Sequence, residues 1–196
     1  EDTVNAGAKV ATITGKGNYA RSLPGLDYTV TAATVTDVVV DVVNATFTGE
    51  ALEPIVTVSG KVNGADKTFS ADEYEIAAHD AFVNAGSYSF SVASPEGSNY
   101  SIPATSATFE ISKHALAVDD VTLEYTTVAF NGDTKEPSVT VKIGDYTVDP
   151  SEYDVDYSGD TVGRIDADAT PAVRITAKED ANITGWAAFS YTISAN

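Results

Sequence analysis

The stretch Phe47-Thr48-Gly49-Glu50-Ala51-Leu52-Glu53-Pro54, followed by Val56-Thr57-Val58, identifies the architecture of this chain because it occurs twice. Phe130-Asn131-Gly132, Glu136-Pro137 and Val139-Thr140-Val141 repeat it 83 residues later. An aromatic residue followed closely by glycine indicates a core side chain at a strand end and a turn after it. The proline restricts the preceding residue to extended geometry, which favours a new strand directly afterwards. The chain therefore contains an internal repeat of β-structure.

The end of each repeat has its own strand pattern. Phe109-Glu110-Ile111-Ser112 recurs as Tyr191-Thr192-Ile193-Ser194, and it occurs a third time as Tyr28-Thr29-Val30-Thr31. Because the third copy has no Phe-x-Gly stretch before it, the first residues match only the second half of a repeat. We therefore divide the 196 residues into the second half of a preceding repeat and two full repeats, at 1–32, 33–114 and 115–196.

Apolar residues alternate with polar residues in the clearest stretches of both full repeats. Tyr88, Phe90 and Val92 alternate with serines, which is the period of a half-buried strand. The segment 71–82 has a helix-like composition, but its counterpart 152–157 alternates, so we expect strands in both. Short strands with frequent turns predict an all-β fold of tandem Ig-like antiparallel β-sandwich modules.

Composition excludes several classes of function. The chain has 11 basic and 29 acidic residues, a net charge of −18, so phosphates would be repelled and nucleic acid is not expected as a partner. There are no cysteines, which excludes disulfides and thiolate metal sites. We expect no membrane insertion, because no run approaches about 18 apolar residues. The sequence also lacks a signal peptide, and we expect a mature or excised piece.

The repeat resembles the MBG domain family, the Ig-like repeats of bacterial surface proteins, especially of Gram-positive organisms. The matching motifs are Phe47 to Pro54, Glu73-Tyr74, Asn84-Ala85-Gly86, Asn99-Tyr100 and Phe109 to Lys113, with Asn5-Ala6-Gly7 and Asn18-Tyr19 in the half repeat. The second full repeat departs at 166–168, where Asp-Ala-Asp stands near the place of Asn-Ala-Gly. The resemblance implies an extracellular, cell-surface or wall-attached protein, whose segment serves as a stalk or adhesin without catalytic residues.

Catalytic motifs are not found in the sequence. The only histidines, His79 and His114, stand at non-equivalent positions, and no Gly-x-Ser-x-Gly motif occurs. We therefore expect no enzyme and no cofactor apart from calcium. Asp119 and Asp120 follow directly on the junction between the full repeats, and calcium is the metal that converging carboxylates there would hold.

A carbohydrate-binding module is the alternative interpretation. Its evidence is Trp186, the only tryptophan, which would need to be exposed and flanked by Tyr146 or Tyr157. The expected partner is thus a protein or a glycan of a host or neighbouring cell.

A covalent staple is a third possibility, because some Ig-like surface modules of Gram-positive bacteria carry an internal isopeptide bond. Lys135, Lys142 and Asn182 are its candidate members. The first full repeat has Leu52 and Ser59 at the two lysine positions, so the lysines are not shared between repeats.

Residues 1–32 form an incomplete repeat by this reasoning. A lone pair of strands is marginally stable in water, and its apolar side and edges would be unpaired. We therefore expect another chain, a separate fragment or the neighbouring module to complement these residues.

Overall fold

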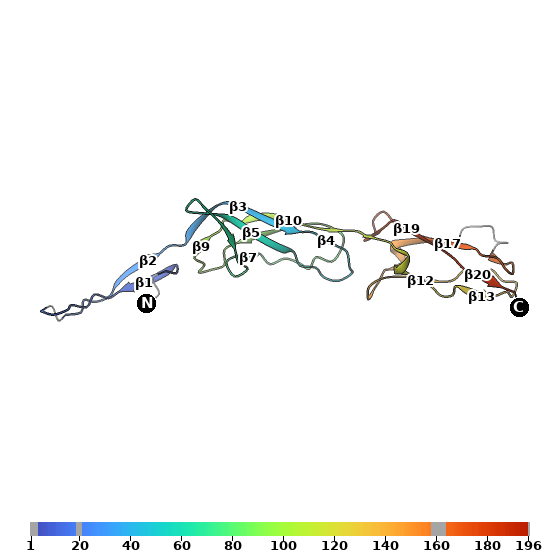
Figure 1. Cartoon of the computed structure of the whole chain (residues 1–196), viewed down its shortest axis with the longest axis horizontal. Coiled ribbons are helices and arrows are strands. Elements are labelled where there is room, and N and C mark those ends of the chain that lie inside the picture. The colour runs from blue at the N-terminus through green and yellow to red at the C-terminus, as the bar shows by residue number, and fades with distance from the viewer. Residues whose placement is uncertain (1–3, 19–20, 158–163, 196) are drawn as a thin grey trace. The chain divides into compact units, whose positions relative to one another are not determined.

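The computed structural model describes residues 4–18, 21–157 and 164–195 (Figure 1). Strands account for 52% of the structure. Short 3-10 helices at Val118–Asp120 and Pro150–Glu152 interrupt the described strands of the second full repeat. The prediction of an all-β fold is confirmed. Within the described residues, no helix has the length and apolar character that crossing a membrane requires.

The chain forms two compact units that combine segments distant in sequence. The first unit comprises Glu1–Val43, Pro54–Asp80 and Tyr88–Phe109. The second comprises Asn44–Glu53, Ala81–Ser87 and Glu110–Asn196. The Phe-x-Gly stretch and the Asn-Ala-Gly turn of the first full repeat thus group with the second full repeat.

The first unit contains a two-stranded ribbon and a four-stranded sheet. The ribbon pairs β1 (Gly7–Ala11) antiparallel with β2 (Leu26–Val30). The sheet has the order β6 (Ala65–Phe69), β5 (Ile55–Val62), β3 (Ala33–Val43), β9 (Tyr100–Ser101). Asn63 and Gly64 connect β5 to β6 with φ angles of 51° and 82°, as expected for a tight hairpin turn.

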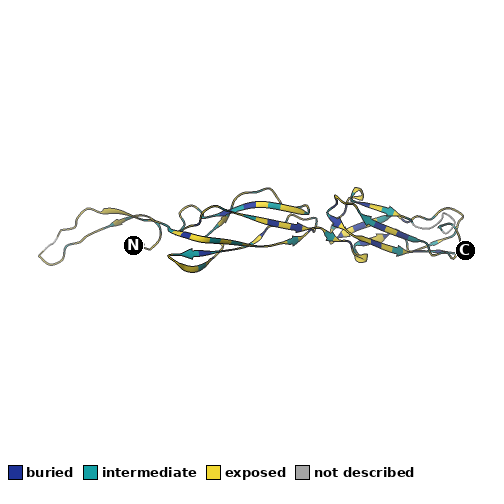
Figure 2. Ribbon diagram, turned by 90° about the horizontal axis from the view of Figure 1, so that it is seen from above, coloured by how far each residue is buried: buried dark blue, intermediate teal, exposed yellow. Residues whose placement is uncertain are grey.

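A second four-stranded sheet has the order β4 (Ala45–Thr46), β10 (Thr105–Ser112), β8 (Gly86–Ala93), β7 (Glu75–Ile76). Its strands alternate buried and exposed positions, as Figure 2 shows for the alternating dark blue and yellow bands. Phe90, Val92, Phe109 and Ile111 are all at most 6% exposed. The period-two prediction for these strands is therefore confirmed.

The remaining strands belong to the second unit and form four small sheets. Their orders are β11 (His114–Ala115) with β18 (Ile183–Thr184); β12 (Val121–Leu123), β14 (Val139–Ile143), β15 (Tyr146–Thr147); β13 (Thr127–Ala129) with β20 (Thr192–Ser194); and β16 (Tyr153–Asp156), β17 (Ala172–Ala177), β19 (Trp186–Ser190). Their core contains Val141, Val173, Ile175 and Ile193, each with no measurable exposure.

The Phe-x-Gly stretch has the same strand partner in both repeats. β4 pairs in parallel with β10, and β13 pairs in parallel with β20. Immediately afterwards, the Phe47 N–H donates to the Ser112 carbonyl and the Phe130 N–H donates to the Ser194 carbonyl, each at 2.9 Å. The repeat read from the sequence is thus a repeat of hydrogen-bond pattern as well.

The strand prediction for 71–82 holds only for β7, Glu75–Ile76, which pairs antiparallel with β8. A turn stands before it, because the Glu73 carboxylate accepts a hydrogen bond from the Ser70 N–H at 2.9 Å. In the second repeat β16, Tyr153–Asp156, pairs with β17 as expected. The helix that local propensity favours for 71–82 does not form.

Candidate functional site

Asn99 contacts the Asn-Ala-Gly turn that opens β1, more than 90 residues before it in the chain. Its Oδ1 accepts a hydrogen bond from the Ala6 N–H at 2.6 Å. Its Nδ2 donates to the Asn5 Oδ1 at 2.7 Å. Because a backbone N–H can only donate, the Ala6 bond fixes which way the Asn99 amide faces.

Asn182 makes the same pair of contacts in the second unit. Its Oδ1 accepts from the Ala85 N–H at 2.8 Å, and its Nδ2 donates to the Asn84 Oδ1 at 3.3 Å. We call each arrangement an asparagine clasp: Asn99 on Asn5-Ala6, and Asn182 on Asn84-Ala85. The clasp joins the second-half strands of one repeat to a loop of the next repeat.

The backbone of each clasp asparagine binds the strand with which its own repeat begins, β3 for Asn99 and β11, which starts one residue before the boundary, for Asn182. The Asn99 carbonyl accepts from the Ala33 N–H at 2.8 Å, and the Asn182 carbonyl accepts from the His114 N–H at 3.0 Å. Short parallel pairings follow directly, β9 with β3 and β18 with β11. One residue therefore holds its own repeat through its backbone and the preceding repeat through its side chain.

A ring contact reinforces the clasp in the second unit. The Tyr146 ring lies edge-on to the Phe47 ring, with centroids 5.5 Å apart and an interplanar angle of 86°. Gly49, with φ of 82°, lies so close that a Cβ there would overlap the Tyr146 ring. Burial raises the pKa of Tyr146 above its ordinary value of 10.0, so its hydroxyl is neutral at physiological pH. Phe47 itself is 1% exposed.

Polar contacts surround Asn182 on its own repeat. The Glu152 carboxylate accepts a hydrogen bond from the Asn182 N–H at 2.7 Å. The Lys113 Nζ, at the end of the preceding repeat, donates to the Glu179 carbonyl. The clasp itself uses only neutral amides, so it can hold two acidic repeats without adding charge to either.

The predicted calcium ligands Asp119 and Asp120 lie in the 3-10 turn that follows β11. The Asp120 Oδ2 accepts from the Ala117 N–H at 2.8 Å and lies 2.9 Å from the His114 Nε2, while Asp119 is exposed. In the described part of the chain, no three His, Asp or Glu side chains gather closely enough to hold a metal ion. Calcium binding stays a prediction, which calorimetry with and without millimolar calcium tests.

The three predicted glycan residues lie in different surroundings. Trp186, in β19, is 56% exposed, and the Arg174 guanidinium lies 4.4 Å from its ring centroid. Tyr146 packs on Phe47, and the Tyr157 hydroxyl donates to the Pro137 carbonyl at 2.6 Å. Trp186 therefore meets the predicted requirement of exposure, but its ring partner is an arginine.

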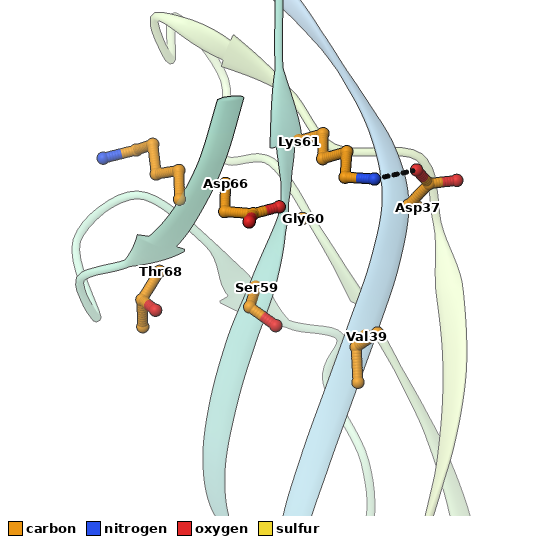
Figure 3. Close-up of a pocket in the computed structure, with 8 residues that line it drawn as sticks. Asp37, Val39, Ser59, Gly60, Lys61, Asp66 and Thr68 are labelled. Carbon is orange, nitrogen blue, oxygen red and sulfur yellow. Dashed lines mark ion pairs between the residues drawn. The ribbon is translucent and has the colours of Figure 1, made fainter. Parts of the chain in front are cut away.

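A polar pocket of about 280 Å³ lies on the sheet of the first unit (Figure 3). Asp37, at a bulge in β3 with φ of 51°, forms an ion pair of 3.3 Å with Lys61. Lys67 also lines the pocket, and its hydrogen bond with the Glu73 carboxylate raises the pKa of Lys67. The mixed charges and hydroxyls could bind a polar ligand, but they form no catalytic arrangement.

The sequence motifs contain the clasp residues but do not show that these residues contact one another. Asn84-Ala85-Gly86 and Asn99-Tyr100 stood out as separate motifs of the repeat. The sequence does contain one signal. The Asn99-Tyr100 motif of the first full repeat corresponds to Asn182-Ile183 in the second, so the asparagine is the same in both repeats whereas the tyrosine is replaced. A residue that is kept when its neighbour changes points to a role of its own side chain. Asn182, considered before as an isopeptide partner, is instead hydrogen-bonded to Asn84 and Ala85.

Comparison with known proteins gives no relative: no family model matches the chain, and no curated protein matches it.

Proposed function

We propose that this chain is a non-catalytic segment of a bacterial cell-surface protein, in which tandem Ig-like β-sandwich modules of the MBG type form a stalk or present a binding surface. The observation that carries the proposal is the asparagine clasp, built in the same way in both units. A stalk needs each module held to the next one, and a repeated contact between repeats serves that purpose. An enzyme has no need of it.

The acidic surface supports an extracellular role. A net charge of −18 keeps an exposed protein soluble and opposes its association with copies of itself. The clasp depends on neutral amides and backbone groups, so it is independent of the ionic strength outside a cell. Ion pairs between modules would instead weaken as salt increases.

Backbone relaxation by NMR tests the stalk. We expect the amides of both full repeats to report one common rotational correlation time in the wild-type chain, and two different times in Asn182→Ala. The matched control is Thr184→Ala, an exposed neighbour on β18. Two different correlation times in the wild-type chain would contradict the proposal.

Location is tested separately. An antiserum raised against the purified chain should label intact cells of the source organism, and brief protease treatment of those cells should release the antigen. Labelling that requires permeabilised cells would contradict a surface location, while leaving the clasp unaffected.

Glycan binding is the second candidate, and the exposure of Trp186 favours it. An exposed indole ring provides a flat apolar surface with a polar edge, which suits a sugar ring. On a glycan array, Trp186→Ala should lose any signal that the wild-type chain gives, whereas Val118→Ala, another exposed apolar residue of this repeat, should keep it. Equal signals from both variants would place binding elsewhere.

A further inference from the structure

The β1–β2 ribbon exposes apolar side chains whose counterparts are buried in the full repeats. Ile13 and Tyr28 are 58% and 38% exposed. Their counterparts in the first full repeat, Val92 and Phe109, are 0% and 1% exposed. Between 4 and 32, no described residue is buried, and Figure 2 shows the ribbon without dark blue.

The ribbon corresponds strand by strand to β8 and β10. Asn5-Ala6-Gly7 opens β1 as Asn84-Ala85-Gly86 opens β8, and both turns are bound by a clasp asparagine. Tyr28-Thr29-Val30 corresponds to Phe109-Glu110-Ile111. Tyr28 and Val30 therefore occupy positions that face the core in a full repeat.

The full repeats show which strands belong on the free edges of the ribbon. β10 is paired in parallel by β4, and β20 is paired in parallel by β13. β8 is paired antiparallel by β7, and β17 by β16. Among the described residues, β1 and β2 form a sheet of two strands only. Each missing neighbour comes from the first half of a repeat.

We infer that the apolar face and both edges of the β1–β2 ribbon are a docking surface for a polypeptide segment that carries the first-half strands of a repeat, with the pattern of residues 33–83. Its β4-like strand pairs in parallel with β2, and its Phe-x-Gly aromatic N–H donates to the Thr31 carbonyl. Phe47 and Phe130 make this bond to Ser112 and Ser194, the counterparts of Thr31.

Side-chain size favours this occupant over a second copy of the ribbon. The ribbon has Ala11 where the first full repeat has Phe90. The space left by the small residue requires large side chains from the incoming segment, and residues 33–83 carry the buried side chains Val58 and Phe69 on neighbouring strands of their own repeat. Two ribbons facing each other would leave this space unfilled, which is costly in a packed core.

Charge also favours the ribbon as the docking surface. Residues 1–32 carry three basic and three acidic residues, whereas 33–114 carries 3 against 11 and 115–196 carries 5 against 15. A segment like 33–83 is acidic, with 2 basic and 9 acidic residues, so the neutral ribbon repels it least.

The test uses the full chain with a first-half segment supplied in two ways. In one arm, a synthetic peptide of residues 33–83 is added to the 196-residue chain. In the other arm, a second copy of residues 33–83 is fused directly before Asn5, which reproduces the order of a full repeat because Val83 precedes Asn84 in the same way. Amide hydrogen exchange of β1 and β2 is followed in both arms. We expect protection to rise at least about tenfold in the fused chain and to rise with concentration of the added peptide.

Two variants test whether the added protection of β1 and β2 comes from docking on the apolar face. Tyr28→Asp places a charge on the apolar face and should abolish the added protection, whereas Thr29→Ser on the opposite face should retain it. Unchanged exchange of β1 and β2 in the fused chain would overturn the proposal. At pH 7, where the net charge of −18 opposes association of copies, a rise in the protection of β1 and β2 with the concentration of the chain alone, together with a dimer in sedimentation, would assign the surface to a second copy and also overturn it.

Discussion

Asn182 shows how a single neutral side chain connects two repeats. Its amide has one acceptor and one donor group, and each has a partner on the preceding Asn-Ala-Gly turn. Its backbone N–H and carbonyl bind Glu152 of its own repeat and His114 at the boundary between the two repeats. All four of its polar groups thus form hydrogen bonds, and another side chain at this position would lose the two that the amide makes.

Replacing Asn182 with alanine should therefore destabilise the second unit. The Ala85 N–H loses its acceptor, and a hydrogen bond lost in this way costs about 1–2 kcal/mol. We expect faster hydrogen exchange at the Ala85 amide and a lower urea midpoint. Thr184→Ala, two residues further along the chain, should change the midpoint much less. Equal effects of the two variants would show that the clasp contributes no stability.

Gly49 and Gly132 provide a matched pair for measuring the Tyr146 contact. Both have a φ of 82°, but only at Gly49 would a Cβ meet the Tyr146 ring. Gly132→Ala should cost about 1–2 kcal/mol from the left-handed backbone alone. Gly49→Ala should cost about 1–3 kcal/mol more, because the ring must move.

A double-mutant cycle checks the origin of that difference. The additional cost of Gly49→Ala should disappear in a Tyr146→Ala background, as measured by urea unfolding. If the additional cost persists without the Tyr146 ring, steric overlap with the ring is not its cause.

Glu73 should make the first unit sensitive to acid. The Ser70 N–H and then the Lys67 ammonium lower the pKa of Glu73 below its ordinary value of 4.5. A lowered carboxyl pKa stabilises the folded state above the ordinary value, and this stability is lost as pH falls through the folded pKa. The difference in thermal midpoint between wild type and Glu73→Gln should therefore be large at pH 7 and small near pH 2.5. Asp41→Asn, which removes one exposed negative charge, controls for net charge.

At the scale of elements, local patterns predicted strands and turns well. The alternation at Tyr88, Phe90 and Val92 predicted β8, and Asn63-Gly64 predicted the β5–β6 hairpin. For 71–82, comparison with the alternating counterpart 152–157 favoured a strand over the helix that composition suggests, and β7 forms there. These features depend on near neighbours in the chain, which a sequence shows directly.

Pairings between distant segments were harder to predict from the sequence. The clasps connect residues 93 to 98 positions apart, and no periodicity marks such pairs. Burial also differs where the motif is the same: Phe47 is buried, whereas Phe130 is only half-buried. Phe47 also has a ring contact with Tyr146, a residue of another segment. A motif fixes the local backbone, but a partner from another segment determines how deeply its side chain is buried.

For the whole molecule, the distribution of charge determines where association is possible. The two full repeats contain all of the excess negative charge, whereas the ribbon is neutral and exposes apolar side chains. Near the isoelectric point of about 4.1, repulsion between copies disappears. Apolar contact at the ribbon is then no longer opposed by charge.

We therefore expect light scattering to show reversible self-association as the pH approaches 4, in the absence of any added segment. Ile13→Ser and Tyr28→Ser should reduce it, because they remove exposed apolar surface. Thr29→Ser, on the other face of β2, is the control. Association that is unchanged in the first two variants would locate the contact on the full repeats.

The clasp also has a consequence in time. The Ala85 N–H finds its acceptor on a residue 97 positions later, so this turn is incomplete when its own repeat has been synthesised. At about 5–20 residues per second, the acceptor follows after about 5–20 s. The Asn-Ala-Gly turn of a nascent repeat thus stays open to solvent, proteases and chaperones until most of the following repeat exists, and completion proceeds in one direction along the growing chain.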